Sequence, residues 1–398
     1  MHTPDQYTFQ LPILVEFGLG VSEKVGTYAK ELGKKVLIVT DRGIVQAGIL
    51  KKITDVLDVF GTDYAVFDEV SPNPTEMDVG EASKHIKDEG CDFIIALGGG
   101  SSIDVAKCTA LLSTNPGKIS DYVMLSFSDL GKIKKHPLKL LTIPTTAGTG
   151  SEVDYWAVLT TSRKMKDSIG QPPMYPGGPY LGATVALVDP LMTIPLPPRQ
   201  TACTGIDALS HLVETYVAKG TNPIVEAWSV YAIDLIARNL RVAFADGSNL
   251  EAREKMMQAS IMGGLNLNYA NLGGIHSLGE GTGGLYGNIP HGVLMGIFFP
   301  HVIDYNRLAN PQRYARIAAA MGEDVHGLSV VNAAKAAAHA VRRLLEDLDL
   351  PTRLKDVGVK RDDLPAIAER AVWDGATGGN PRAVTQADFV KIAEKAYE

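Results

Sequence analysis

The first half of the chain alternates short hydrophobic runs with segments of helical periodicity. Runs rich in β-branched residues, typical of strands, occur at 34–40, 62–70, 92–97, 139–144 and 183–190. Helical patterns lie between them, at 45–60, in the segment that ends at Gly90, and from Ser102 onward. Strand and helix in alternation predict an α/β domain with a parallel, Rossmann-like sheet and helices on both of its faces.

The pattern changes near residue 195. Helical periodicity then dominates, and it predicts helices at 199–218, 223–243, 250–268, 291–303, 311–321, 328–348 and 384–397. This change of period predicts two domains, an α/β domain over 1–194 and an all-α domain over 195–398. Open α/β sheets bind ligands beyond the carboxyl ends of their strands, so we expect a site between the two domains.

Composition narrows the class of partner. The net charge is −7 and no cluster of Lys and Arg occurs, which argues against nucleic acid or an anionic membrane surface and favours a small molecule. The three cysteines have no CxxC spacing, so a reducing, cytoplasmic setting is expected. The first ten residues do not resemble a signal peptide, and no apolar run approaches the ~20 residues that span a bilayer.

Two glycine-rich loops follow predicted strands. Gly98, Gly99 and Gly100 connect a hydrophobic run to a helix, where free N–H groups and the helix dipole suit a phosphate. The alternative to a phosphate site is that these glycines only form a tight turn between the strand and the helix. The loop at 143–152 is a second candidate, and two such loops indicate a long ligand. Asp41, at the end of an earlier strand, is the only obvious candidate carboxylate for binding a ribose, although a helix-capping or turn aspartate is the simpler interpretation.

Polar residues interrupt a buried helical pattern in "IDALSHLVE". Asp207 and His211 are four residues apart and so project from one helix face. His276 and His291 bracket a glycine-rich segment that can fold back towards them. One carboxylate and three imidazoles suit Fe²⁺, Zn²⁺ or a similar divalent metal. Taken singly, each histidine is more simply explained as a hydrogen-bonded residue of the core or surface.

The chain resembles the group III, metal-dependent (iron-type) alcohol dehydrogenases, a family that includes lactaldehyde:propanediol oxidoreductase and 1,3-propanediol dehydrogenase. The likeness rests on "FGLG", "SPNPT", "GGGSSIDVAK", "IPTTAGTGSEV", "TACTGIDALSHLVE", "NIPHG" and "GGNPR", in that order. It implies a dehydroquinate synthase-like N-terminal domain that binds NAD(P), a metal-binding helical domain, and reversible hydride transfer between NAD(P) and a small primary alcohol or diol, or its aldehyde. It also implies a homo-oligomer.

The resemblance assigns roles to particular residues. The metal ligands would be Asp207, His211, His276 and His291. The pyrophosphate would rest on Gly98, Gly99, Gly100, Ser101 and Ser102, and the rest of the cofactor would lie along Asn73, Thr145, Thr146 and Lys166. We predict NAD rather than NADP, because the Asp41 carboxylate would repel a 2′-phosphate; the adjacent Arg42 keeps NADP open.

Three departures from the family pattern concern the substrate. Glu280 stands where the family commonly has a second histidine, Asp154 replaces a small hydroxyl residue, and the 170–182 connection is longer. We interpret Glu280 as a pocket residue that tunes substrate choice or proton transfer, with Asp154 beside it; a solvated Glu280 is the alternative. Two other functions stay open: a zinc enzyme like glycerol dehydrogenase, and a catalytically silent NAD- or metal-binding scaffold.

Overall fold

In the part of the chain that the structure describes, six parallel strands form one twisted sheet in the order β1-β6-β5-β4-β2-β3. A computed structural model describes residues 6–11, 13–124, 132–160 and 174–398. The strands are β1 (Leu14–Phe17), β2 (Lys35–Val39), β3 (Asp63–Phe67), β4 (Phe93–Gly98), β5 (Leu140–Pro144) and β6 (Val185–Val188). β4 and β5 are buried along their whole length, as expected of central strands in a sheet that is covered on both faces.

Helices cover both faces of this sheet. They are α1 (Val25–Leu32), α2 (Arg42–Gln46), α3 (Ile49–Phe60), α4 (Glu76–Asp88) and α5 (Gly100–Thr114). Alternate strand residues point to opposite faces: Val36 packs in one hydrophobic cluster with α1 and α3, whereas Leu37 packs in another with α4 and α5. Burial on both faces explains why the strands read as continuous hydrophobic runs.

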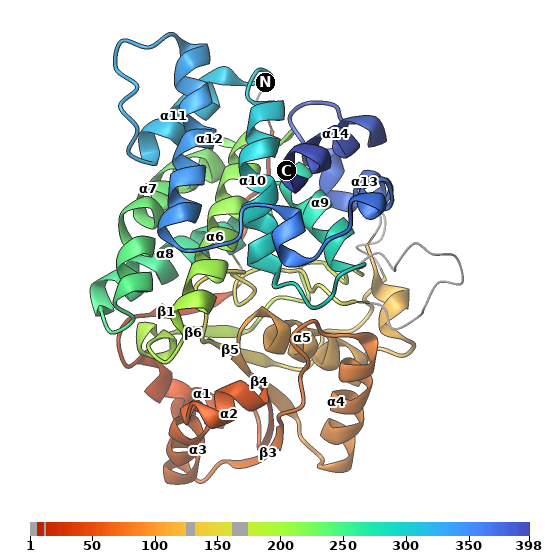
Figure 1. Cartoon of the computed structure of the whole chain (residues 1–398). Coiled ribbons are helices and arrows are strands. Elements are labelled where there is room, and N and C mark those ends of the chain that lie inside the picture. The colour runs from red at the N-terminus through yellow and green to blue at the C-terminus, as the bar shows by residue number, and fades with distance from the viewer. Residues whose placement is uncertain (1–5, 12, 125–131, 161–173) are drawn as a thin grey trace.

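The second half of the described chain is helical and lies against the carboxyl ends of the strands, as Figure 1 shows. Its helices are α6 (Pro198–Val217), α7 (Pro223–Ala245), α8 (Leu250–Leu267), α9 (Gly274–Gly283), α10 (His291–Asn306), α11 (Pro311–Ala320), α12 (Val330–Asp347), α13 (Leu364–Trp373) and α14 (Gln386–Tyr397). α6 is the most central, with sixteen buried residues. The predicted fold class is confirmed; the domain boundary at residue 194 stays a prediction.

The sequence patterns missed β1, α1, α9 and α13, and they merged α2 with α3. β1 is a short, half-exposed edge strand, so its pattern is weak. α9 has the sequence GIHSLGEGTG, which has low intrinsic helix propensity. Its glycines serve packing: a Cβ on Gly281 would lie 2.8 Å from the Ile367 carbonyl oxygen in α13. Tertiary contacts with α10 and α13 therefore stabilise a helix that its sequence does not favour.

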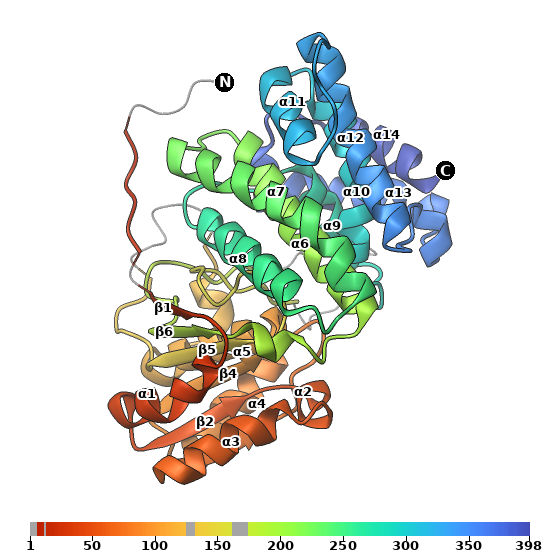
Figure 2. The same cartoon turned by 90° about the vertical axis from the view of Figure 1, so that its left-hand side faces the viewer.

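The N-terminal segment runs from the sheet along the helical half (Figure 2). Phe9 packs against the rings of Trp228 in α7 and Tyr269, with ring centroids 5.4 and 4.4 Å away. This contact packs the segment that precedes the first strand of the sheet against the helical half. Among the described helices, none combines the length and apolar character needed to cross a bilayer.

Candidate active site

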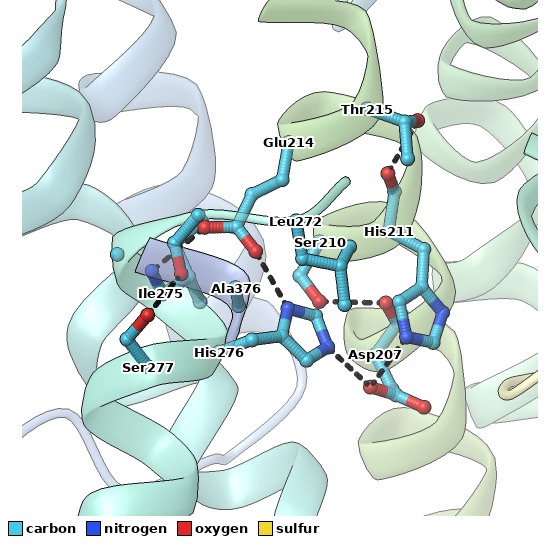
Figure 3. A network of polar contacts seen from close by, with 12 residues as sticks. Asp207, Ser210, His211, Glu214, Thr215, Leu272, Ile275, His276, Ser277 and Ala376 are labelled. Carbon is cyan, nitrogen blue, oxygen red and sulfur yellow. Dashed lines mark hydrogen bonds and ion pairs between the residues drawn. The ribbon is translucent and has the colours of Figure 1, made fainter. Parts of the chain in front are cut away.

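α6 presents three ionisable side chains to the centre of the helical half. Asp207, His211 and Glu214 are each at most 6 % exposed, and they recur at intervals of four and three residues. This spacing places them along one face of the helix. Figure 3 shows Glu214 and Asp207 reaching His276 of α9, with the His211 ring on the other side of the Asp207 carboxylate.

His276 and His291 complete the cluster from two other helices. Asp207 Oδ1 lies 3.8 Å from His211 Nε2, 3.7 Å from His276 Nε2 and 3.4 Å from His291 Nε2. Candidate ligand atoms of Asp207, His276 and His291 all lie within 4.8 Å of one another. His211 stands beside this trio, with its ring stacked on that of His276 at a centroid distance of 4.7 Å. The four residues predicted from the sequence are thus gathered in one place.

Two polar atoms that face the centre of this cluster have no hydrogen-bond partner. Among the described residues these are Asp207 Oδ1 and His276 Nε2, both of which are buried. Each such atom costs roughly 1–3 kcal/mol when nothing satisfies it. A divalent cation at their centre would satisfy the carboxylate and the Nε2 atoms together, and the donor set is one that Fe²⁺ and Zn²⁺ accept. The residues therefore fit a metal.

Glu214 orients His276 for this role. Its Oε2 lies 2.6 Å from His276 Nδ1, and its Oε1 accepts a hydrogen bond from the Ile275 N–H at 2.7 Å. A carboxylate that accepts the Nδ1 proton leaves Nε2 facing Asp207, the arrangement typical of metal-binding histidines. Burial lowers the pKa of His276, but the neighbouring Asp207 and Glu214 carboxylates outweigh burial and raise the pKa to about 10.

His211 differs from His276 in its protonation. Burial lowers its pKa to about 4, and the neighbouring Asp207 carboxylate only partly opposes this. His211 is accordingly a neutral imidazole at physiological pH. The neutral form is the one that coordinates a metal.

A cleft of about 2500 Å³ connects this cluster to the sheet. Its walls include Gly99, Ser102 and Thr146 at the carboxyl ends of the strands, and Asp207 and His276 on the helical side. A ligand that occupied the whole cleft would reach from the glycine loop to the histidine cluster. The predicted location of the site, between the two halves of the chain, is thus where the structure has its cleft.

The glycine loop has the form of an anion cradle. β4 ends at Gly98 and α5 begins at Gly100, so free N–H groups at the start of α5 face the cleft. Gly98 has a φ of 153°, and a Cβ there would lie 2.6 Å from Ser102 Oγ. Only glycine satisfies both conditions. Thr145 donates its N–H to the Gly98 carbonyl at 3.0 Å, which holds the second loop beside the first.

The sequence of this chain matches known families over both halves. The model "Iron-containing alcohol dehydrogenase" matches residues 12–190, and the model "Fe-containing alcohol dehydrogenase family, C-terminal" matches residues 201–397. The chain belongs to the iron-containing alcohol dehydrogenase family. It is an alcohol dehydrogenase, and neither a silent scaffold nor a zinc enzyme of the glycerol dehydrogenase type is favoured by these matches.

Relatives of this alcohol dehydrogenase are similar over their full length. The 1,3-propanediol dehydrogenase of Citrobacter freundii is 40 % identical over 98 % of this chain and 99 % of its own. The crystal structure of a 1,3-propanediol oxidoreductase superposes with a TM-score of 0.93 at 38 % identity, and covers 98 % of this chain and 100 % of its own. Sulfoacetaldehyde reductase from Bifidobacterium kashiwanohense, solved in complex with NAD⁺, has a TM-score of 0.85 at 27 % identity, with 99 % of each chain covered.

Two predicted cofactor residues form contacts within the protein. Asp41 caps α2, because its Oδ1 accepts hydrogen bonds from Gly43 N at 2.8 Å and Ile44 N at 3.2 Å. Its Oδ2 is turned to the cradle, 3.4 Å from Ser102 Oγ. The capping interpretation is therefore correct, and the ribose-binding role of Asp41 stays a prediction. Asn73 Nδ2 donates to the Gly287 carbonyl in the helical half, across the cleft.

Most of the predicted site residues line the cleft. The cleft-lining set is Asp41, Asn73, Gly99, Gly100, Ser101, Ser102, Thr145, Thr146, Asp154, Asp207, His211, His276, Glu280 and His291. Gly98 does not line the cleft, but its backbone conformation shapes the cradle. Lys166 and the start of the 170–182 connection lie outside the described residues. The roles of all these residues stay predictions.

Glu280 lies one helical turn beyond His276 in α9, beside the cluster. Its Oε1 is 3.6 Å from His291 Nδ1, and its side chain is only 18 % exposed. Burial raises its pKa, and the nearby His291 only partly opposes this. The structure thus places Glu280 in the pocket and not on the solvated surface.

Asp154 has a different environment from the one expected. Its Oδ1 is 2.6 Å from Lys107 Nζ and also accepts the Trp156 N–H at 2.9 Å. Its carboxylate is therefore engaged in a buried ion pair, although the residue lies at the cleft wall. Burial raises the pKa of Asp154, and the Lys107 ammonium opposes this.

Sequence reasoning missed Glu214 and Lys107. Glu214 stands at the end of the quoted "IDALSHLVE", seven residues after Asp207 and three after His211. A third charged residue at helical spacing on a buried face was the signal that could have found it. Lys107 lies within the quoted "GGGSSIDVAK", in a helix that is buried around its whole circumference from Ser102 to Leu111. A lysine in such a helix needs a buried partner.

Proposed function

We propose that this alcohol dehydrogenase transfers hydride between NAD and a small, uncharged alcohol or its aldehyde, with Fe²⁺ held by Asp207, His211, His276 and His291. The observation that carries the proposal is the continuous cleft between the anion cradle and the histidine cluster with its unpartnered atoms. The chain's similarity to a 1,3-propanediol dehydrogenase and to a reductase that was solved in complex with NAD⁺ supports it. A homo-oligomer and a cytoplasmic location stay predictions.

Different groups of residues serve metal binding, cofactor binding and the substrate end of the cleft. When bound, the metal would lower the alcohol pKa from roughly 16 towards neutrality and would polarise an aldehyde carbonyl. The cradle anchors the pyrophosphate through backbone N–H groups, and the Thr145–Thr146 loop borders the cofactor space beside it. Glu280, 3.6 Å from His291, is placed to set the charge at the substrate end of the cleft and to hold a proton there.

An absorbance assay tests this function. NADH formation at 340 nm is followed with a panel of short alcohols and diols, and NADH loss with the matching aldehydes, each with and without chelator. We expect turnover that a chelator abolishes and that Fe²⁺ restores better than Zn²⁺. Turnover that is unaffected after complete metal removal, shown by elemental analysis, would refute the metal assignment.

Cofactor preference follows from Asp41. Its carboxylate repels a 2′-phosphate, so kcat/KM for NAD should exceed that for NADP by at least ~10-fold, about 1.4 kcal/mol. Asp41→Gly should reduce this preference. Asp41→Asn is the sharper variant, because an amide oxygen can still cap α2 while the charge is gone. Equal kcat/KM for both cofactors in the unmodified protein would disprove the assignment.

Substrate charge should depend on Glu280. A carboxylate at this point disfavours an anionic substrate and leaves neutral diols and amino alcohols acceptable. Glu280→Gln keeps the shape and removes the charge, so the ratio of kcat/KM for 1,3-propanediol to that for a hydroxy acid of equal chain length should fall by at least ~10-fold, about 1.4 kcal/mol. An unchanged ratio would show that Glu280 does not face the substrate.

A further inference from the structure

Lys107 is a fully buried lysine outside the metal cluster and without contact to it. It lies two turns into α5, the helix whose first residues form the anion cradle. Its Nζ donates to Asp154 Oδ1 at 2.6 Å, to Ser151 Oγ at 2.9 Å and to the Trp156 carbonyl at 2.6 Å. All three ammonium protons are thus used. A buried ammonium is retained only where its partners offset a large desolvation cost.

The three acceptors all belong to one segment, residues 151–158, which follows the second glycine-rich loop. A second α5 side chain, Asp104, holds the same segment: Asp104 Oδ1 accepts from Ser151 Oγ at 2.5 Å, and Asp104 Oδ2 accepts from the Val158 N–H at 2.9 Å. Asp104 and Lys107 are three residues apart and so share a helix face. Side chains of α5 therefore hydrogen-bond to both ends of the segment, at Ser151 and at Val158.

The opposite side of this segment contacts the helical half. Trp156 Nε1 donates to the Leu267 carbonyl at 3.1 Å, and the Tyr155 N–H donates to Asn268 Oδ1 at 2.9 Å. Asn268 Nδ2 in turn donates to the Val153 carbonyl at 3.0 Å. The segment is thus bonded to α5 on one side and to the end of α8 on the other.

The same segment is also a wall of the cleft. Ser151, Asp154, Trp156 and Val158 line it, together with the first residues of α5. A shift of this wall relative to α5 would change the distance between a cofactor anchored on the cradle and a substrate held near the metal cluster. Misplacement by about 1 Å can cost on the order of 10²-fold in rate.

We propose that Lys107, with Asp104, is a positioning residue that fixes the cleft wall 151–158 against the cofactor cradle, so that nicotinamide and substrate meet at reacting distance. This inference rests on the proposed hydride transfer. Lys107 touches neither the cleft nor the metal cluster among the contacts above, so its loss should leave cofactor and metal binding in place. It should slow the hydride step itself.

The test compares Lys107→Met with the double variant Lys107→Met/Asp154→Leu. The single variant strands the Asp154 carboxylate, and this can prevent folding; the double variant replaces a buried pair by apolar side chains, which is often neutral for stability. Lys84→Met, at an exposed position of α4, is the matched control for loss of a lysine. Melting temperature, metal content and NAD affinity are measured for each protein.

The readout is the rate of hydride transfer. In the folded double variant we expect kcat to fall at least ~10-fold, NAD affinity to stay within about threefold, metal content to stay equal, and the isotope effect on kcat with a 1,1-dideuterated alcohol to increase. Unchanged kcat and isotope effect would overturn the inference, and so would a joint loss of fold, metal and NAD binding in both variants. Absence of turnover in the unmodified protein would instead contradict the proposed function.

Discussion

His291→Ala is expected to lose the metal and to lower kcat by at least ~10³-fold. A metal ion held there would supply several kcal/mol to this chemistry, and each ~1.4 kcal/mol corresponds to a factor of ten in rate. His291 is the first residue of α10, and its side chain is 37 % exposed, so its removal leaves no cavity in the core. The fold should therefore survive. Elemental analysis, circular dichroism and the 340 nm assay measure the three quantities.

His301→Ala is the matched control, because His301 lies in the same helix and outside the cluster. It should retain metal and turnover. If His291→Ala kept full metal content and near-normal kcat, His291 would not be a ligand. If both variants lost metal equally, the effect would belong to α10 as a whole and not to the imidazole at its first turn.

Glu214→Gln is expected to weaken metal binding by roughly 10- to 100-fold, the usual cost of losing an outer partner of a metal-binding histidine. Both Glu214 oxygens accept hydrogen bonds, one from Ile275 N and one from His276 Nδ1. A glutamine offers one oxygen and one NH₂ group, so one of the two donors would face another donor. The orientation of His276 would then no longer be fixed.

The measurement for Glu214→Gln is a competition titration with a metal-sensitive chelator. At saturating metal, the variant should recover most of the activity of the unmodified protein, because the ligands themselves are intact. Metal affinity equal to that of the unmodified protein would show that the bond between Glu214 and His276 has no influence on the site. Activity that stays low at saturating metal would assign Glu214 a role beyond orientation.

The sequence was most informative where local pattern and tertiary role agree. The strands at 92–97 and 139–144 are buried on both faces, so their hydrophobic runs were unambiguous. The spacing of Asp207 and His211 indicated one helix face because α6 is a regular helix of 20 residues. The four candidate metal ligands were proposed partly from this spacing and partly from family resemblance, and the structure brings their side chains together.

Other features depend on contacts between distant segments, and local pattern does not contain them. The glycine-rich sequence of α9 gives no helical signal. The helix is stabilised by its packing against α13, and its glycines allow α13 to approach closely. The role of Glu214 depends on His276, 62 residues away along the chain. Asp154 was expected beside the substrate, and only the fold reveals that Lys107, 47 residues earlier, engages its carboxylate.

Anomalous scattering at the iron absorption edge from crystals of the Fe²⁺-loaded protein tests the central claim most directly. The account predicts one strong anomalous peak per chain, surrounded by Asp207 and the Nε2 atoms of His211, His276 and His291, at the end of the cleft opposite the glycine cradle. A peak bound by other residues, or no peak in protein that is active and contains iron, would contradict it.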